Sequence, residues 1–333
     1  MIQRAAATVA LGAVALLLAG CASAATGANE GGEGAEQLGS TGAGGFEAAL
    51  AAVPGPGAGP ADIAFADYAA ARAALGADEA GAGVDALRLL GDELGMILPA
   101  PFGWNRAELA GEVDETIGVS LADVTAFVDW QGDVGDVLAF DAPDDAGARL
   151  TAALGEPADG VWAHGEEDGG VDLSLGEAAM RSQRIAEVDG RVVIASTGEL
   201  LELVREGDVA ADDEARAEAA RALDEREVLA AMLNRPSLGA DSSFSWVGGG
   251  VSHDGGVTRD HLVWVVAEGG DVEASAERVR ENLASGATAD GTPFSELLEV
   301  EDVTVSGRLI IADARPVGSA PVWSQLLYRG DLG

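Results

Sequence analysis

The chain has 333 residues, 48% of them hydrophobic, which is enough to bury the core of one large domain or two ordinary ones. It carries 57 acidic residues against 19 basic ones, a net charge of −38, and every basic residue is an arginine. A surface this acidic repels phosphate backbones, which argues against nucleic-acid binding. The single cysteine excludes an internal disulfide, so the fold depends on its core.

The N-terminus has the pattern of an export signal. Arg4 supplies one positive charge, and the apolar run from Ala5 to Ala19 contains no charged residue. This run is shorter than the roughly 18 to 20 apolar residues that span a bilayer core. It ends at Leu18-Ala19-Gly20-Cys21, which resembles the lipobox of bacterial lipoproteins. We therefore expect residues 1–20 to be a lipoprotein signal peptide.

The resemblance implies a defined chemistry at Cys21. Its thiol would take a diacylglyceryl group, become the new N-terminus and hold an extracellular body on the outer face of the cell membrane. One acyl chain, such as a palmitate, attaches a protein only marginally, and the two or three chains of a lipoprotein anchor make attachment stable. Two alternatives are an ordinary secretory signal with an incidental cysteine and an uncleaved helical anchor.

The composition bears on the source and on the segment behind Cys21. Abundant Ala, Gly, Val, Asp and Arg without Lys is typical of a GC-rich genome, so the chain looks like an actinobacterial lipoprotein, with a halophile as the alternative source. Residues 21–60 are rich in Gly and end in alternating Pro and Gly, which predicts a flexible tether. The acidic body would be repelled by anionic headgroups and stand off the membrane.

Residues 61–209 are predicted to form a first α+β lobe. Apolar spacing and helix stop signals predict four helices, over Tyr68–Leu75, Val84–Leu94, Arg106–Val119 and 143–154. Strands are expected over Val137–Phe140 and Val161–Ala163, followed by a hairpin over Arg184–Ala195 and a helix from Thr197 to Val204. Asp189-Gly190 in the hairpin is a strong signal for a tight turn between strands.

Residues 210–333 are predicted to form a linking helix, Asp213–Leu233, and a second α+β lobe. The lobe would contain a strand over His261–Ala267, a helix over Asp271–Leu283 and a hairpin over 300–312. Glu187–Ala195 matches Thr304–Ala312 position by position at a spacing of 117 residues, and Phe140 corresponds to Val266. The fold class is therefore α+β, with two related lobes, each a sheet with helices on one face. An internal duplication explains the match; a chance likeness of two similar segments is the alternative.

No catalytic, metal or cofactor site follows from the motifs. His164, His253 and His261 lack metal-ligand spacing and are predicted to be surface or strand residues. The acidic stretch Asp129–Asp136 fails the EF-hand pattern, because its sixth position is Val134 rather than Gly. Gly248–Gly250 lacks the Lys-Ser/Thr of a phosphate loop and is predicted to be a loop or bulge.

Tryptophans are the remaining candidates for ligand contact. Trp162, Trp246 and Trp264 are speculative ligand-lining residues, and the alternative is that they fill the core. We expect a non-enzymatic partner-binding or scaffold module of the cell envelope, whose partners are the membrane, through Cys21, and an envelope protein. The alternative is a lipoprotein that binds a small molecule, lipid or glycan between its lobes. An envelope enzyme is the weakest interpretation, since no residue of the body carries a motif of a characterised family.

Overall fold

The structure is a computed structural model that describes residues 45–77, 90–95, 107–164, 183–236, 243–318 and 320–332. The chain divides into two units, Met1–Gly39 and Ser40–Gly333. The predicted signal peptide and Cys21 lie outside the described residues. In the described part, no helix is long and apolar enough to cross a membrane.

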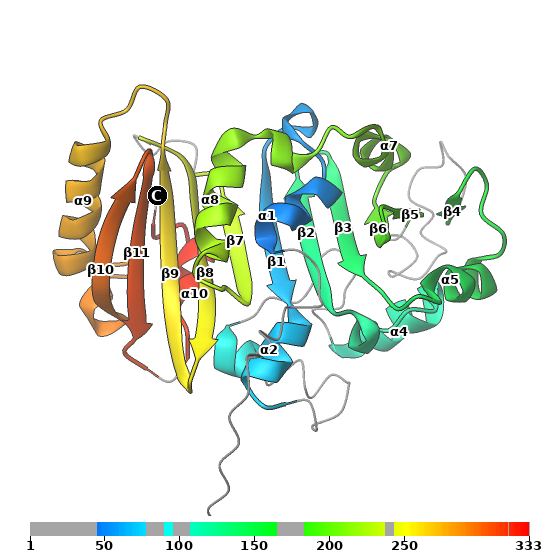
Figure 1. The fold of residues 1–333 in the computed structure, drawn as a ribbon, viewed down its shortest axis with the longest axis horizontal. Coiled ribbons are helices and arrows are strands. Elements are labelled where there is room, and N and C mark those ends of the chain that lie inside the picture. Colours follow the sequence, from blue (N-terminus) through cyan, green and yellow to red (C-terminus); the bar gives the residue numbers. More distant parts are fainter. Residues whose placement is uncertain are drawn as a thin grey trace, which may run out of the picture. The chain divides into compact units, whose positions relative to one another are not determined.

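A single antiparallel sheet forms the centre of the second unit (Figure 1). Its eleven described strands lie in the order β10-β11-β9-β8-β7-β1-β2-β3-β6-β5-β4. The strands are β1 (Ala61–Asp67), β2 (Ala126–Gly132), β3 (Gly135–Asp141), β4 (Val161–Ala163), β5 (Arg184–Val188), β6 (Arg191–Ala195), β7 (Ala230–Asn234), β8 (Phe244–Asp254), β9 (Val257–Val266), β10 (Leu298–Ser306) and β11 (Leu309–Pro316).

Helices cover both faces of the sheet, which corrects the prediction of helices on one face. The α8 face is covered by α1 (Phe46–Ala49), α7 (Gly198–Glu206) and α8 (Glu214–Asp224). The opposite, α9 face is covered by α2 (Tyr68–Ala74), α4 (Ala107–Ile117), α5 (Ala146–Leu154), α9 (Val272–Ser285) and α10 (Trp323–Tyr328). Short 3-10 turns are η1 (Leu50–Ala52), η2 (Pro56–Ala58), η3 (Leu121–Asp123), η4 (Ala210–Asp212) and η5 (Phe294–Glu296).

The two halves of the sheet repeat one arrangement. In the first, hairpin β2–β3 leads through α5 to hairpin β5–β6, and β6 returns to pair with β3. In the second, hairpin β8–β9 leads through α9 to hairpin β10–β11, and β11 returns to pair with β9. Pairing of β1 with β7 joins the halves. The fold is α+β, and residues 61–209 and 210–333 are halves of one compact unit rather than separate lobes.

The repeat is offset by one residue from the match in the sequence. Val188 pairs with Arg191 across the first tight turn, and Ser306 pairs with Leu309 across the second. These pairs give a spacing of 118 residues rather than 117. The spacing of 118 also keeps equivalent residues on one face, as for Val193 and its counterpart Ile311, which both lie on the α8 face. A shift of one residue would exchange the two faces.

Part of the predicted tether belongs to the folded body, which corrects its boundary. Phe46, Leu50 and Val53 are fully buried on the α8 face. The Phe46 ring stacks on Phe65 of β1, with ring centroids 5.3 Å apart. The three residues follow helical spacing, so an amphipathic signal is present in the Gly-rich segment. The folded body therefore includes residues from 45 onward, and the earlier part of the predicted tether lies outside the described residues.

The predicted linking helix is half as long as expected. α8 ends at Asp224, and Glu227 has a positive φ of 53°, which no helix accommodates. The chain then enters β7, a short buried strand between β1 and β8. Gly248–Gly250, predicted to be a loop or bulge, lies inside β8, where a Cβ on Gly250 would approach the Ala230 carbonyl oxygen to 2.7 Å.

Several local predictions are confirmed. The hairpin over Arg184–Ala195 turns at Asp189 and Gly190, both with positive φ. Thr197 caps α7 by accepting the N–H of Leu200, and α5 ends at Gly155 as expected. Of the predicted helix Val84–Leu94, only residues 90–94 are described, and they are helical.

Candidate functional site

The three candidate tryptophans lie at three separate places and do not form one site. Trp162 in β4 is 7% exposed, and its indole N–H donates to Thr151 Oγ1 at 3.3 Å. Trp264 in β9 lies on the α9 face, and its N–H donates to the Leu332 carbonyl at 2.7 Å. Trp246 in β8 lies on the α8 face beneath two arginine side chains. All three are buried in the core.

Two cavities bear on the prediction of a ligand site. A cavity of about 210 Å³ lies at the seam between the halves, where Asp62 at the start of β1 meets Asn234 and Arg235 at the end of β7. No tryptophan lines it. Trp264 lines a second cavity of about 240 Å³ beside α9, together with Phe244. The seam thus offers a small polar recess.

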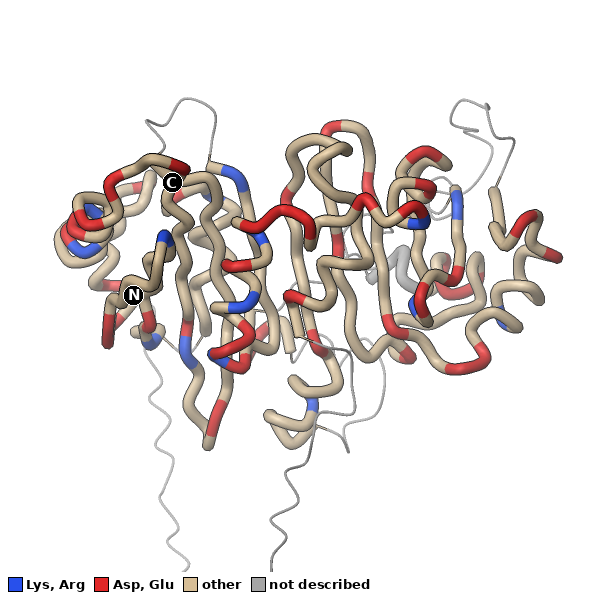
Figure 2. Tube along the Cα trace, turned by 45° about the horizontal axis from the view of Figure 1, so that its top comes forward, with Lys and Arg blue, Asp and Glu red and all other residues tan. Residues whose placement is uncertain are grey.

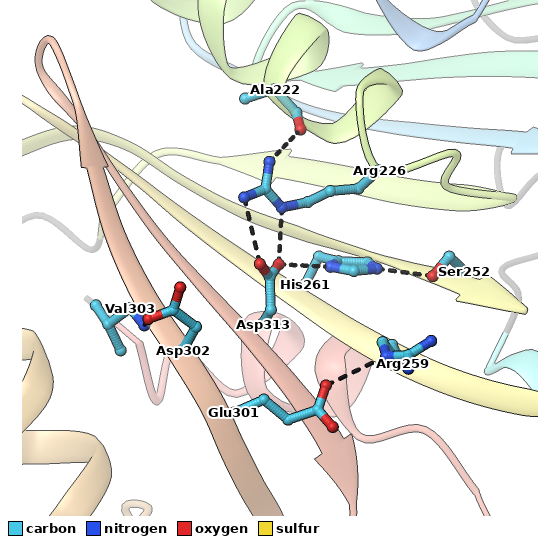
Figure 3. A network of polar contacts seen from close by, with 9 residues as sticks. All are labelled: Ala222, Arg226, Ser252, Arg259, His261, Glu301, Asp302, Val303 and Asp313. Atoms are coloured by element: carbon cyan, nitrogen blue, oxygen red, sulfur yellow. Dashed lines mark hydrogen bonds and ion pairs between the residues drawn. The ribbon is translucent and has the colours of Figure 1, made fainter.

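A continuous polar network crosses three strands on the α8 face (Figure 3). The Ser252 Oγ lies 2.8 Å from His261 Nε2, and His261 Nδ1 lies 2.8 Å from Asp313 Oδ1. Arg226, just beyond α8, donates from Nε to Asp313 Oδ1 at 2.7 Å and from Nη2 to Asp313 Oδ2 at 3.3 Å. Its Nη1 donates to the Ala222 carbonyl at 3.0 Å, which ties the network to the helix.

Strand register brings these residues together. The Gly255-Gly256 turn pairs Asp254 with Val257, so Ser252 lies opposite Arg259, two residues before His261. Asp313 lies directly opposite His261 in the β9–β11 pair. Alternation along the strands then points the Ser252, His261 and Asp313 side chains to one face.

The Asp313 carboxylate carries the negative charge of the network. Partial burial acts to raise the pKa of Asp313, but hydrogen bonds from His261 and Arg226 outweigh it and lower that pKa to about 2. An ionised Asp313 can only accept, so the Nδ1–H of His261 is the donor in their contact. Two ion pairs lie beside the network. The Glu301 carboxylate contacts Arg259 Nε at 3.2 Å and Arg315 Nε at 2.5 Å.

The order hydroxyl, imidazole, carboxylate is that of nucleophilic catalysis by serine. Two features oppose that role here. Ser252 is 9% exposed and His261 4% exposed, so a substrate carbonyl has little access to the hydroxyl. Arg226 also holds both oxygens of Asp313, so that carboxylate already balances a full positive charge. The arrangement is therefore suited to fastening the end of α8 to strands β8, β9 and β11.

The prediction that His261 is a strand residue is confirmed, but its partners were missed. The Gly255-Gly256 pair after Asp254 is a two-residue turn signal that would have set the Ser252–Arg259 register. Pairing with Asp313 joins residues 52 positions apart, and no local pattern announces it. His253 is a strand residue too, with Nδ1 2.9 Å from Thr258 Oγ1.

The acidic stretch Asp129–Asp136 spans the end of β2, the turn that follows it and the start of β3. Asp129 is fully buried within β2, and its Oδ2 accepts the Gln131 side-chain N–H at 3.0 Å. Burial lowers the pKa of His164. Within the described residues, no three His, Cys, Asp or Glu side chains are placed to hold a metal ion.

Comparisons with known proteins add little. No family model matches the chain, and no curated protein matches it significantly. Among solved structures, it is similar to crystal form I of TP0453, with 8% identity, a TM-score of 0.41, and 84% of this chain and 97% of that chain covered. Crystal form III of TP0453 gives 10% identity, a TM-score of 0.38, and coverage of 83% and 96%. A likeness this weak carries no argument about function.

Proposed function

We propose that the chain is a lipoprotein held on the outer face of the cell membrane by a lipid on Cys21, with a body that serves as a non-enzymatic partner-binding or scaffold module. The observation that carries this proposal is the sequence Leu18-Ala19-Gly20-Cys21 at the end of an apolar run, with the only cysteine of the chain at its last position. Two or three acyl chains would make the attachment stable.

The charge distribution supports a body that stands in solvent. Figure 2 shows acidic residues spread along helices and loops of both halves, with arginines at far fewer positions. Such a surface is repelled by anionic headgroups and favours association with a positively charged partner surface. The partner class we propose is therefore an envelope protein with a basic face.

Lipid attachment is tested by Cys21→Ala. We expect the wild-type chain to enter the detergent phase in a partition assay and to incorporate labelled palmitate, and the variant to do neither, because no other thiol can accept the lipid. Ser23→Ala is the matched control, since it changes a neighbouring residue outside the Leu18–Cys21 pattern. A Cys21→Ala chain that stays in the detergent phase would contradict the proposal.

The non-enzymatic role is tested at Ser252. A fluorophosphonate probe reacts with serines that a neighbouring histidine activates. Because Ser252 is 9% exposed, we expect no labelling under conditions that fully label a known serine hydrolase. Labelling that disappears in Ser252→Ala would assign the network to catalysis and overturn the non-enzymatic proposal, whatever the outcome at Cys21.

A further inference from the structure

Two arginine side chains lie over the ring of Trp246: Arg216, in the first turn of α8, and Arg235, just after β7. The Arg216 guanidinium carbon is 4.5 Å from the ring centroid, and that of Arg235 is 5.3 Å from it. We propose that Arg216 and Arg235 form, over Trp246, a binding site for a small oxyanion of the phosphate or carboxylate type. This site goes beyond the proposed function and does not depend on the lipid anchor.

Arg216 is the first part of the case, because its charge is buried without adequate partners. The residue is 0% exposed, and none of its three guanidinium nitrogens has a hydrogen-bond partner in the described part of the chain. Within the described residues it has one ion pair, from Nε to Asp213 Oδ2 at 3.3 Å. Buried guanidinium donors that lack partners are costly, and in folded proteins they are normally satisfied by a protein group, water or an ion.

The local charge is the second part. Over the Trp246 ring, two guanidinium groups face one carboxylate, that of Asp213, in a chain whose net charge is −38. Asp213 Oδ1 is already engaged, since it caps α8 by accepting the N–H groups of Ala215 and Arg216. Asp62 accepts the backbone N–H of Arg235 rather than its guanidinium. An oxyanion would therefore be the missing partner of the two side chains.

The helix adds a third contribution of the same sign. Arg216 lies in the first turn of α8, a helix of 11 residues whose dipole places partial positive charge at this end. Burial lowers the pKa of Arg216, Asp213 acts to raise it, and nearby Arg235 lowers it further. The indole ring stabilises both cations from below, but it supplies no hydrogen-bond acceptor.

Burial of Arg216 sets the size of the ligand. The fold of this chain covers the Arg216 side chain completely, so a group attached to a large partner has no path to it. The ligand that we propose is therefore a small free anion. Arg235 is exposed, so an anion from solvent meets Arg235 first. Phosphate and acetate represent the two chemistries.

The test compares thermal unfolding of the full chain in sodium chloride and in sodium phosphate or acetate, at equal pH and ionic strength. Equal ionic strength matters because general screening also stabilises a chain this acidic. We expect phosphate or acetate to raise the Tm of the wild type by about 2 to 4 °C in a saturable way. We expect this rise to be lost in Arg216→Met, which keeps a long side chain over the ring.

Controls separate the site from net charge. Arg149→Met on α5 removes one positive charge from a paired, partly exposed side chain and should keep the full anion-dependent rise. In chloride, Arg216→Met loses its ion pair with Asp213 and its cation contact with the Trp246 ring, so the anion-dependent rise of each chain is measured against its own Tm in chloride. If that variant does not fold, Arg235→Met should shift the saturation point at least several-fold. A wild type with no anion-specific rise, or an Arg216→Met chain that retains it, would overturn the site.

Discussion

Replacement of Asp260 by asparagine is expected to raise the free energy of unfolding by about 2 to 4 kcal/mol at pH 8 and to change it little at pH 4. Asp260 is fully buried in β9, on the α9 face. Its Oδ2 accepts the Val322 N–H at 2.9 Å, at the start of α10. Burial raises the pKa of Asp260 to about 7, although backbone N–H groups of Val322 and Trp323 act to lower it.

The sign of this effect follows from which state holds the proton. The ordinary aspartate pKa of 3.8 applies to the unfolded chain. Between pH 3.8 and about 7 the folded state keeps a proton that the unfolded state loses, so stability falls as pH rises, by about 1.4 kcal/mol per pH unit. The loss is complete above pH 7 and amounts to about 4 kcal/mol. Asparagine does not titrate, so the variant escapes this loss.

The lower limit of the gain is set by the new amide. Its oxygen can keep the hydrogen bond from Val322, but its NH₂ group takes the place of Oδ1, which has no hydrogen-bond partner in the described part of the chain. An unsatisfied buried donor costs about 1 to 3 kcal/mol. A protonated carboxyl carries one such donor and the amide carries two, so the variant should be slightly less stable than the wild type at pH 4, and its gain at pH 8 is reduced by the same amount.

Urea denaturation from pH 4 to 8 measures the difference. Asp271→Asn is the matched control, because Asp271 is exposed, caps α9 by accepting the Ala274 N–H, and carries the same charge. Asparagine caps a helix as well as aspartate does, so this control should differ from the wild type by less than about 0.5 kcal/mol at every pH. An Asp260→Asn chain whose stability falls from pH 4 to 8 as steeply as that of the wild type would show that Asp260 is ionised without cost.

Local signals determined the elements that the sequence could predict. Asp189-Gly190 specifies its turn by itself, because both residues tolerate positive φ. Helices with clear caps, such as α7 after Thr197, need no distant information either. The repeated order of strand, helix and hairpin could be predicted for the same reason, since each hairpin has its own turn signal.

Pairing between distant segments could not be predicted in this way. β7 is rich in Ala, Met and Leu, which favour helix, and tertiary pairing with β1 and β8 overrides that preference. The same pairing turns two predicted lobes into one sheet. β8 was hidden by Gly248–Gly250, whose lack of side chains suits close neighbouring backbones rather than a loop. The high glycine content of residues 21–60 likewise led to the prediction that Phe46 belongs to a flexible tether.

Phe46→Ala is expected to lower the free energy of unfolding by about 3 to 4 kcal/mol. Phe46 is 0% exposed, stacks on Phe65 and is fixed at its backbone, because its N–H donates to Asp224 Oδ1 at 2.7 Å. Truncation removes the ring and leaves a cavity between α1 and β1 that the sheet cannot close. A residue of a flexible tether would cost nothing when truncated, so the size of the effect separates the two interpretations.

Val134→Ala provides the scale for this comparison. Val134 is 58% exposed in the β2–β3 turn, so its truncation should change stability by less than about 0.5 kcal/mol in the same urea denaturation experiment. Loss of the ion pair between Glu47 and Arg221 of α8 is a second comparison, because this pair lies next to the Phe46 contact and is exposed, so its removal should cost little. If Phe46→Ala falls within the range of these two changes, α1 does not belong to the core. If it exceeds them several-fold, α1 belongs to the core, and the folded body includes Phe46.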